Sequence, residues 1–364
     1  MLMDESKQSK SESRDLSRVS QEAATKFAES LPKLLNLVND KFAVDERLSE
    51  KALTEGRTEL TRDAHAHFGR MLRAILEFGL YRDMEEEFAW YVSTLSARGL
   101  GESYFRRMIE GWIIAIHSSI EPPLSSELTY PLEWLRKRLH SLHVDRREAA
   151  FVLSKEAESF LNLVLEGRRR DATEYVLSLR ETGFAPDRLF SDVVLAALGQ
   201  VGLMWQRNEL SVADEHAATE ICRYVIYRII DSMPVEGALP YRMIVACVPG
   251  EEHELGARIL ADYLGTRGWS VKYLGRSTPE EDLIAAVASE GIDITILSVT
   301  LLENLPAARD LLSRIRERVP GMKTAIGGRA ALKARAVLES YTDAVVSGFD
   351  EAHSVCLRLV GGNA

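Results

Sequence analysis

Cysteine is scarce in this sequence. Cys222, Cys247 and Cys356 are the three cysteines among 364 residues, and no pair has the spacing of a metal site or of a CxxC motif. This excludes a cysteine-based metal centre of the usual spacing and a disulfide framework. It is typical of a protein from a reduced compartment, so we expect a cytoplasmic protein.

An excess of basic residues is also missing. The chain has 55 Asp and Glu against 45 Lys and Arg, which gives a net charge of −10. Nucleic-acid-binding surfaces need clustered Lys and Arg, and the sequence contains neither a basic helix nor a helix-turn-helix pattern. The start of the chain lacks the apolar core of a signal peptide, and we find no apolar run long enough for a bilayer. We therefore predict that the protein binds neither DNA nor a membrane.

The hydrophobic pattern divides the chain into four parts. Residues 1–16 are polar and are expected to be disordered. Residues 17–143 show apolar positions at helical spacing, broken at 121–131 by three prolines, and predict an all-helical domain. Residues 146–235 predict a bundle of four helices, at 146–167, 169–183, 185–206 and 211–233. Residues 240–364 predict a third folded domain.

Beyond Tyr241 the pattern changes to short, β-branched strands that are apolar at consecutive positions. They lie at 243–248, 270–275, 292–299, 323–328 and 343–348, and helical segments alternate with them. This pattern predicts a doubly wound parallel sheet of five strands, buried on both faces. Ligands bind such sheets outside the carboxyl ends of the strands.

Two helix starts are marked by capping residues. Ser211, with Asp214 three residues later, predicts the start of the fourth bundle helix. Thr278 as N-cap, Pro279 at the first helical position and Glu281 as the reciprocal partner predict another start after the second strand.

Polar residues and glycines follow three of the predicted strands. The first strand is followed by Glu251-x-His253-x-x-Gly256, the third ends in Ser298-Val299-Thr300, and the fourth ends in Gly327-Gly328. A histidine in a turn can offer a ring nitrogen to a metal while a nearby carboxylate fixes the ring. Taken singly, such a histidine is an ordinary surface residue and such glycines are turns. In this order, each at a strand end, they indicate a ligand site.

This combination resembles the cobalamin-binding domain family. The resemblance implies that His253 is the lower axial ligand of cobalt and that Glu251 is its hydrogen-bond partner, in a place where the family usually has Asp. It further implies that a slot for the nucleotide tail of cobalamin is lined by Gly256, Ser298, Thr300, Gly327 and Gly328.

The third and fourth bundle helices carry a second motif. Trp205 is followed, after nine residues, by Glu215-His216. The alternative interpretation is a core tryptophan and a solvated helix start. The spacing resembles the light-sensing adenosylcobalamin proteins typified by CarH, which implies that Trp205 packs on the adenosyl group, Glu215 holds its ribose and His216 lies at the upper face. Gln206 stands where that family has the histidine that binds cobalt after photolysis.

The first helical domain resembles the globin-like sensor domain of the photocobilins, which bind cobalamin and biliverdin. Because no cysteine precedes Cys222, a bilin in this domain would be non-covalent. Aromatic walls and cations suit a bilin, although the same residues also fit a helix core and a solvated face. Haem on His65 or His67 is the alternative, ranked lower because both lie in a polar segment. The candidate bilin-binding residues are Trp90, Tyr91, Tyr104, Arg106, Arg107, Trp112 and His117.

The resemblances together predict a photoreceptor rather than an enzyme. Adenosylcobalamin would lie between the four-helix cap and the sheet, with biliverdin as second chromophore. Photolysis of the cobalt–carbon bond would change the homo-oligomeric state or the binding of a downstream signalling protein. The alternatives are a corrinoid carrier for methyl transfer and a cobalamin-sensing regulator that ignores light.

Overall fold

The computed structural model of the protein describes residues 19–48, 55–144 and 153–361. The chain divides into two compact units, Met1–Ala150 and Phe151–Ala364, which are described separately. The predicted disordered tail, residues 1–16, lies outside the described residues.

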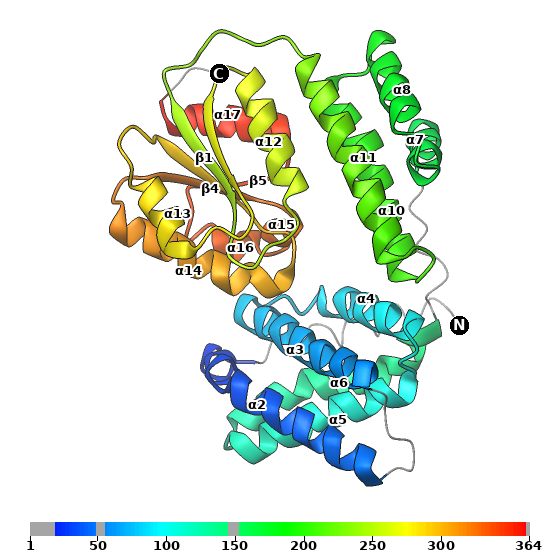
Figure 1. Ribbon diagram of the computed structural model, residues 1–364. Coiled ribbons are helices and arrows are strands. Elements are labelled where there is room, and N and C mark those ends of the chain that lie inside the picture. The colour runs from blue at the N-terminus through cyan, green and yellow to red at the C-terminus, as the bar shows by residue number, and fades with distance from the viewer. Residues whose placement is uncertain (1–18, 49–54, 145–152, 362–364) are drawn as a thin grey trace, which may run out of the picture. The chain divides into compact units, whose positions relative to one another are not determined.

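The described part of the first unit is all-helical, as predicted. Its packing surface is apolar at helical spacing, with Phe27, Phe68 and Trp112 fully buried. Ser20 precedes the first of these helices, and its hydroxyl accepts a hydrogen bond from the Ala23 N–H (3.2 Å), as an N-cap does. The helices are α2 (Gln21–Leu48), α3 (Glu55–Phe78), α4 (Met84–Ala97), α5 (Glu102–Ser119) and α6 (Leu124–Val144) (Figure 1).

The predicted break at 121–131 is wrong in its extent. Helix α6 begins at Leu124 and continues through Pro131. A proline inside a helix removes one backbone hydrogen bond and costs about 3 kcal/mol. Burial of the flanking Leu128, Leu132 and Leu135, each 0% exposed, offsets that cost through packing that the local sequence pattern does not reveal.

The second unit begins with four helices, as predicted. The third is continuous in space, but its middle part is a π-helix. The predicted capping box is confirmed, because the Ser211 hydroxyl accepts from the Asp214 N–H and the Asp214 carboxylate accepts from the Ser211 N–H. The first helix begins at Lys155, and the predicted stretch 146–152 lies outside the described residues. The bounds are α7 (Lys155–Leu165), α8 (Arg169–Glu181), α9 (Pro186–Arg188), η3 (Leu189–Leu195), α10 (Ala196–Gln206) and α11 (Val212–Asp231).

The segment Pro186–Gln206 is long and apolar enough to cross a membrane by length and composition. The expectation that no apolar run reaches this length is therefore wrong. In the structure Phe190, Val193 and Val194 are fully buried in the core of the four helices. This packing accounts for the apolar character of the segment.

The remainder of the second unit is the predicted five-stranded sheet. All strands are parallel, in the order β2-β1-β3-β4-β5. The chain therefore reverses its winding direction between β1 and β3, which is where ligands bind in doubly wound folds. The strands are β1 (Arg242–Cys247), β2 (Ser270–Gly275), β3 (Ile294–Ser298), β4 (Lys323–Gly327) and β5 (Ala344–Val346).

Helices alternate with these strands along the chain (Figure 1). The predicted cap at Thr278 is wrong. Its hydroxyl donates to the Leu274 carbonyl (3.1 Å), and the next helix starts one residue later, at Glu280, with Pro279 before it. The connecting elements are α12 (Leu255–Thr266), α13 (Glu280–Val287), η4 (Leu302–Asn304), α14 (Leu305–Arg318), α15 (Arg329–Lys333), α16 (Arg335–Leu338) and α17 (Phe349–Leu359).

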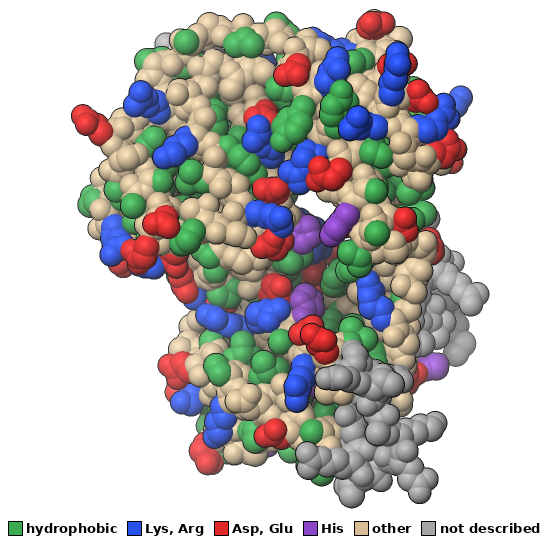
Figure 2. All heavy atoms as spheres, in the orientation of Figure 1, with side chains coloured by type: hydrophobic (Ala, Val, Ile, Leu, Met, Phe, Trp, Pro, Cys, Tyr) green, Lys and Arg blue, Asp and Glu red, His purple; other side chains and the backbone are tan. Residues whose placement is uncertain are grey.

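Charged side chains of both signs are interspersed over each unit on the face shown in Figure 2. This mixture is expected from the composition, because the chain has 45 Lys and Arg beside 55 Asp and Glu.

The carboxyl ends of the three central strands lie level with one another. Cys247 of β1 is opposite Ser298 of β3, which is opposite Gly327 of β4. Gly328 follows with φ of 103°, and a Cβ atom there would lie 2.3 Å from the Val299 carbonyl oxygen. Glycine is therefore required at 328 by the close approach of the neighbouring backbone.

Replacement of Gly328 by Ala should destabilise the fold by about 3 kcal/mol or more, because a strained φ and a backbone clash add together. Gly321→Ala is the matched control, since Gly321 has φ of 88° but open space around its Cβ position. The control should cost about 1 to 2 kcal/mol. Equal losses in chemical denaturation would show that the contact with Val299 is unimportant.

Candidate functional site

A buried carboxylate organises the edge of the sheet beyond β1. Glu251 is 0% exposed. Its Oε2 accepts hydrogen bonds from the backbone N–H groups of Thr300 (2.8 Å) and Leu301 (3.0 Å), which follow β3. Its Oε1 accepts from the backbone N–H of His253 (2.9 Å). One side chain thus ties the turn after β1 to the segment after β3.

The imidazole of His253 is held by the same carboxylate. Its Nδ1 lies 2.7 Å from Oε1 of Glu251, and its side chain is 56% exposed. A carboxylate only accepts hydrogen bonds, so Nδ1 carries a proton, and the neutral form of the ring has its lone pair on Nε2. This is the arrangement found in metal-ligating histidines, in which an outer carboxylate fixes the tautomer and raises the basicity of the ring.

Glu251 is ionised despite its burial. Burial by itself raises the pKa of this carboxyl, but the hydrogen bonds from His253, Leu301 and Thr300 outweigh it and lower the pKa to about 2. The histidine therefore has a permanently charged partner over the physiological range.

Asn304 is part of this cluster and was not identified from the sequence. It is 8% exposed, and its Nδ2 donates to Oε2 of Glu251 (3.1 Å) and to the Gly250 carbonyl (3.3 Å). It ends η4, six residues after the last residue of β3. An asparagine at a helix start is a common capping residue, so its sequence context carried no signal for this role.

The other predicted residues of the sheet edge differ in whether they are open to a ligand or already have a structural role within the protein. Gly256 is exposed at the first turn of α12 with open space at its Cβ position, so a bulky ligand can approach it. Ser298 and Gly327 lie level on adjacent strands. The backbone of Thr300 binds Glu251, and Gly328 is required by Val299, so both have a structural role within the protein itself.

The predicted cap residues lie on either side of one tight turn. Trp205 is near the end of α10, Asn208 adopts φ of 59° in the turn, and Glu215 lies in the first turn of α11. Glu215 accepts from the Thr219 hydroxyl (2.8 Å) and lies 2.6 Å from Nδ1 of His216, whose side chain is 73% exposed. Gln206 is also at the end of α10 and is buried, at 6% exposed.

Helix α12, which follows His253, is shared between the cap and the sheet. Arg223 of α11 forms an ion pair with Glu254 (3.0 Å), the residue before α12. The guanidinium of Arg258 in α12 lies 5.2 Å from the ring centroid of Tyr227 in α11 and 5.1 Å from that of Tyr273 in β2. These contacts attach the fourth cap helix to the element that begins beside His253.

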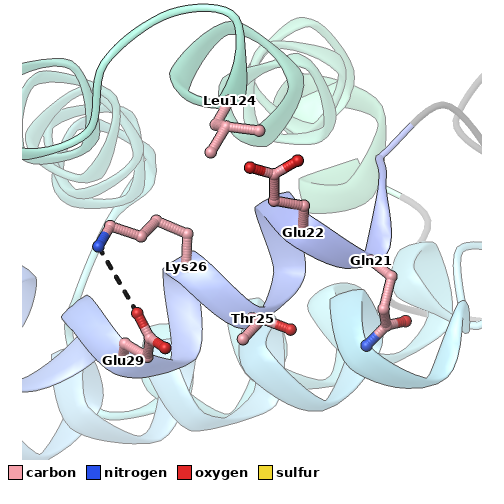
Figure 3. Close-up of a pocket in the computed structure, with 6 residues that line it drawn as sticks. All are labelled: Gln21, Glu22, Thr25, Lys26, Glu29 and Leu124. Atoms are coloured by element: carbon pink, nitrogen blue, oxygen red, sulfur yellow. Dashed lines mark ion pairs between the residues drawn. The ribbon is translucent and has the colours of Figure 1, made fainter.

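Two hollows in the described part of the chain are lined by residues other than the predicted site residues. One of about 580 Å³ lies beside α12 and β2 and includes Arg258, Trp269 and Tyr273 among its walls. The other, of about 310 Å³, lies at the start of α2 against Leu124, where Lys26 and Glu29 form an exposed ion pair (Figure 3). The side chains that line this second hollow are exposed or half-buried, and none of them is a buried polar group that could bind a ligand.

The structure separates the seven candidate bilin-binding residues by exposure. Tyr91, Tyr104 and Trp112 are buried in the core of the first unit. The remaining four are at its surface, with Trp90 39% exposed and Arg106 in an ion pair with Glu102. The others are Arg107, exposed above the Phe42 ring, and His117, whose Nε2 lies 3.3 Å from the Thr129 hydroxyl.

The polar segment that contains His65 and His67 does not keep both side chains at the surface. His65 is 1% exposed and lies in the core, while His67 is half-buried and stacks on Tyr91 with ring centroids 5.8 Å apart. The polar residues near them in sequence occupy the outer face of α3, and the helix turns His65 inward.

Protonation of Glu251 should remove stability at low pH. Its folded pKa of about 2 lies below the ordinary 4.5, so its contribution is complete above pH 4.5 and is lost as the pH falls toward 2. The shift corresponds to about 3 kcal/mol. Glu251→Gln should therefore lower the free energy of unfolding at neutral pH by an amount of this order. The difference from the native protein should shrink as the pH falls from 4.5 toward 2.

Glu252→Gln is the control, because that neighbouring side chain is 58% exposed and its ion pair with Arg276 lies at the surface. It should change stability by less than about 1 kcal/mol. If the free energies of unfolding of the two variants change with pH in the same way across this range, the assignment is wrong.

The second unit matches known protein families in both of its parts. Residues 241–357 match the B12 binding domain family, and residues 156–230 match a second B12 binding domain family. The first match covers the sheet with Glu251 and His253, and the second covers the four helices with Trp205 and Glu215.

The chain is also similar to curated proteins over part of its length. The chain is 32% identical over 170 residues to the HTH-type transcriptional repressor CarH of Myxococcus xanthus, covering 46% of this chain and 55% of that repressor. It is 24% identical over 171 residues to dimethylamine corrinoid protein 1 of Methanosarcina acetivorans, covering 46% of this chain and 80% of that protein. The chain thus spans little more than half of the repressor.

A solved structure is also similar to part of the chain. The monomethylamine corrinoid protein of Methanosarcina barkeri aligns with 56% of this chain and 98% of its own, at 17% identity and a TM-score of 0.48. The second unit is thus similar to B12 binding domains over residues 156–230 and 241–357.

Proposed function

We propose that this protein is a photoreceptor that holds adenosylcobalamin between the four-helix cap and the sheet. The observation that carries the proposal is the exposed imidazole of His253, whose Nδ1 is held by the buried, ionised Glu251. When bound, adenosylcobalamin supplies a visible-light chromophore whose cobalt–carbon bond is broken by light.

The sheet edge has the chemistry that a cobalt ligand needs. His253 offers a neutral nitrogen with a lone pair, and Glu251 keeps the ring oriented through Nδ1. Asn304, with the backbone of Thr300 and Leu301, holds the other carboxylate oxygen so that Glu251 cannot rotate away. The open space at Gly256 leaves room for the corrin ring and the nucleotide tail.

The cap residues support the assignment of the upper ligand. Trp205 provides a flat apolar wall, and Glu215 provides a carboxylate that can accept hydrogen bonds from ribose hydroxyls. Both lie beside the same turn between α10 and α11. Gln206 has no basic nitrogen, so we assign the position above cobalt after photolysis to His216 or to water.

Biliverdin is the proposed second chromophore, held without a covalent bond in the first unit. The support is the aromatic core of that unit, which includes Tyr91, Tyr104 and Trp112. Arg107 lies at the rim of this core, over Phe42, where it can pair with a propionate.

We propose that the signal leaves through a change of homo-oligomeric state or through a downstream protein, without an enzymatic activity of this chain. The named relatives include a transcriptional repressor, but the aligned 170 residues cover 55% of it. We infer that this chain acts without DNA contact, in keeping with its net charge of −10.

A corrinoid carrier for methyl transfer is the second candidate. It is favoured by the similarity to dimethylamine corrinoid protein 1, of which 80% is covered. This candidate requires the same His253 and Glu251, but it gives Glu215 no ligand to hold. The two proposals therefore differ at the cap.

His253→Ala should remove the lower ligand that the protein supplies to the cobalt of cobalamin. The absorption spectrum of the bound cobalamin should shift to that of a form without an imidazole ligand, and affinity should fall by more than about tenfold. The control is His216→Ala on the exposed side of α11, which leaves the lower position intact. If both variants keep the native spectrum and affinity, the axial assignment is wrong.

Illumination of the protein loaded with adenosylcobalamin in the dark should change its spectrum irreversibly. Glu215→Gln should weaken adenosylcobalamin binding by about tenfold, with little effect on methylcobalamin, because one charged acceptor for the ribose is lost. The matched control is Glu209→Gln, in the exposed turn before α11. An unchanged spectrum after illumination would contradict light sensing. Methyl-group turnover with equal affinity for both cobalamins would favour the carrier.

A further inference from the structure

Helix α10 is apolar on sides that the described protein does not cover. From Ala196 to Gln206 it carries no charged side chain, and Gln200 and Gln206 are its two polar residues. Its buried residues are Ala197, Val201 and Gln206, and the others are half-buried or exposed. A helix that is apolar all round is ordinarily buried. Part of the surface of α10 therefore has the composition of a contact surface.

Gly202 lies in this uncovered part of α10. It is exposed, and there is open space at its Cβ position. Glycine inside a helix is less favourable than alanine, because its backbone loses more entropy on folding. A close neighbour can require it, as at Gly69 in α3, where a Cβ atom would lie 2.7 Å from the ring of Trp112. No described neighbour requires it at Gly202, so the fold itself gives no reason for this glycine.

Leu198 and Trp205 flank Gly202 on one face of the helix. Residues three and four positions apart are neighbours on a helix surface, and both side chains are half-buried. Gly202 therefore leaves a notch about one side chain wide between them. The notch is apolar, and the indole of Trp205 is one of its walls. A flat heterocycle suits such a surface, because aromatic rings in contact prefer offset stacking.

We propose that Gly202 selects the upper ligand of cobalamin, because the notch admits the adenine of an adenosyl group beside Trp205. A side chain at position 202 would fill the notch and exclude the ring. This inference rests on the proposed function and adds the residue that sets the size of the upper ligand. A methyl group has no ring to place in the notch, so binding of methylcobalamin does not depend on residue 202.

The test titrates the full-length protein in the dark with adenosylcobalamin and, separately, with methylcobalamin. Gly202→Val fills the notch and should weaken adenosylcobalamin binding by more than about tenfold, with methylcobalamin binding changed by less than about twofold. Gly265→Val is the matched control, because Gly265 also has open space at its Cβ position and lies at the end of α12 away from His253. It should leave both affinities unchanged.

Gly202→Ala separates what the fold requires from what the ligand requires. In the protein without cobalamin it should raise the midpoint of thermal unfolding by about 1 to 4 °C, because alanine is the better helix former and meets no neighbour. It should also weaken adenosylcobalamin binding, by less than Gly202→Val does. A lower midpoint would show that the fold requires the glycine and would overturn the inference.

The titrations distinguish failure of this inference from failure of the proposed function. If the native protein binds adenosylcobalamin and Gly202→Val keeps both affinities or loses both equally, the role of Gly202 is wrong while the photoreceptor stands. Retained affinities with a loss of homo-oligomer would assign this face to a second copy of the chain and would also overturn the inference. If the native protein binds methylcobalamin but not adenosylcobalamin, the photoreceptor and this inference fail together.

Discussion

The arrangement of the second unit depends on the hydrogen bonds of one buried carboxylate. Glu251 has no contact with water, yet it is ionised because five donors surround its two oxygens. Loss of this side chain would leave the backbone N–H groups of His253, Thr300 and Leu301 without their acceptors and the His253 ring without an orienting partner. The same interaction therefore holds the ends of β1 and β3 together and prepares a nitrogen ligand at their edge.

Helix α12 connects that edge to the cap. Its residues Ile259 and Tyr263 are buried in the same hydrophobic cluster as the cap helices, and Arg258 lies between aromatic rings of the cap and of β2. A shift of α11 would disturb the helix that begins beside His253. The cap and the sheet edge are thus connected through packed side chains and one ion pair from Arg223.

The sequence predicted elements best where local pattern and tertiary packing agree. The five strands were predicted close to their bounds, because strands buried on both faces are apolar at consecutive positions. The Ser211 cap was predicted because its hydrogen bonds are local. The helix break at Pro131 was predicted wrongly, because the packing of α6 on α5 outweighs the cost of a proline inside α6. The cap at Thr278 was predicted wrongly, because its hydroxyl donates to the nearby Leu274 carbonyl.

The sequence by itself determined the residue types of the site and their order, because Glu251, His253, Ser298 and the two glycines all follow strands. The tertiary structure decided which of them act together. Parallel pairing of β1 with β3 brings the Thr300 and Leu301 N–H groups to Glu251, and η4 adds Asn304 from 53 positions away. The tertiary structure also placed His65 inside a core, since helix packing and not the polarity of its neighbours sets burial.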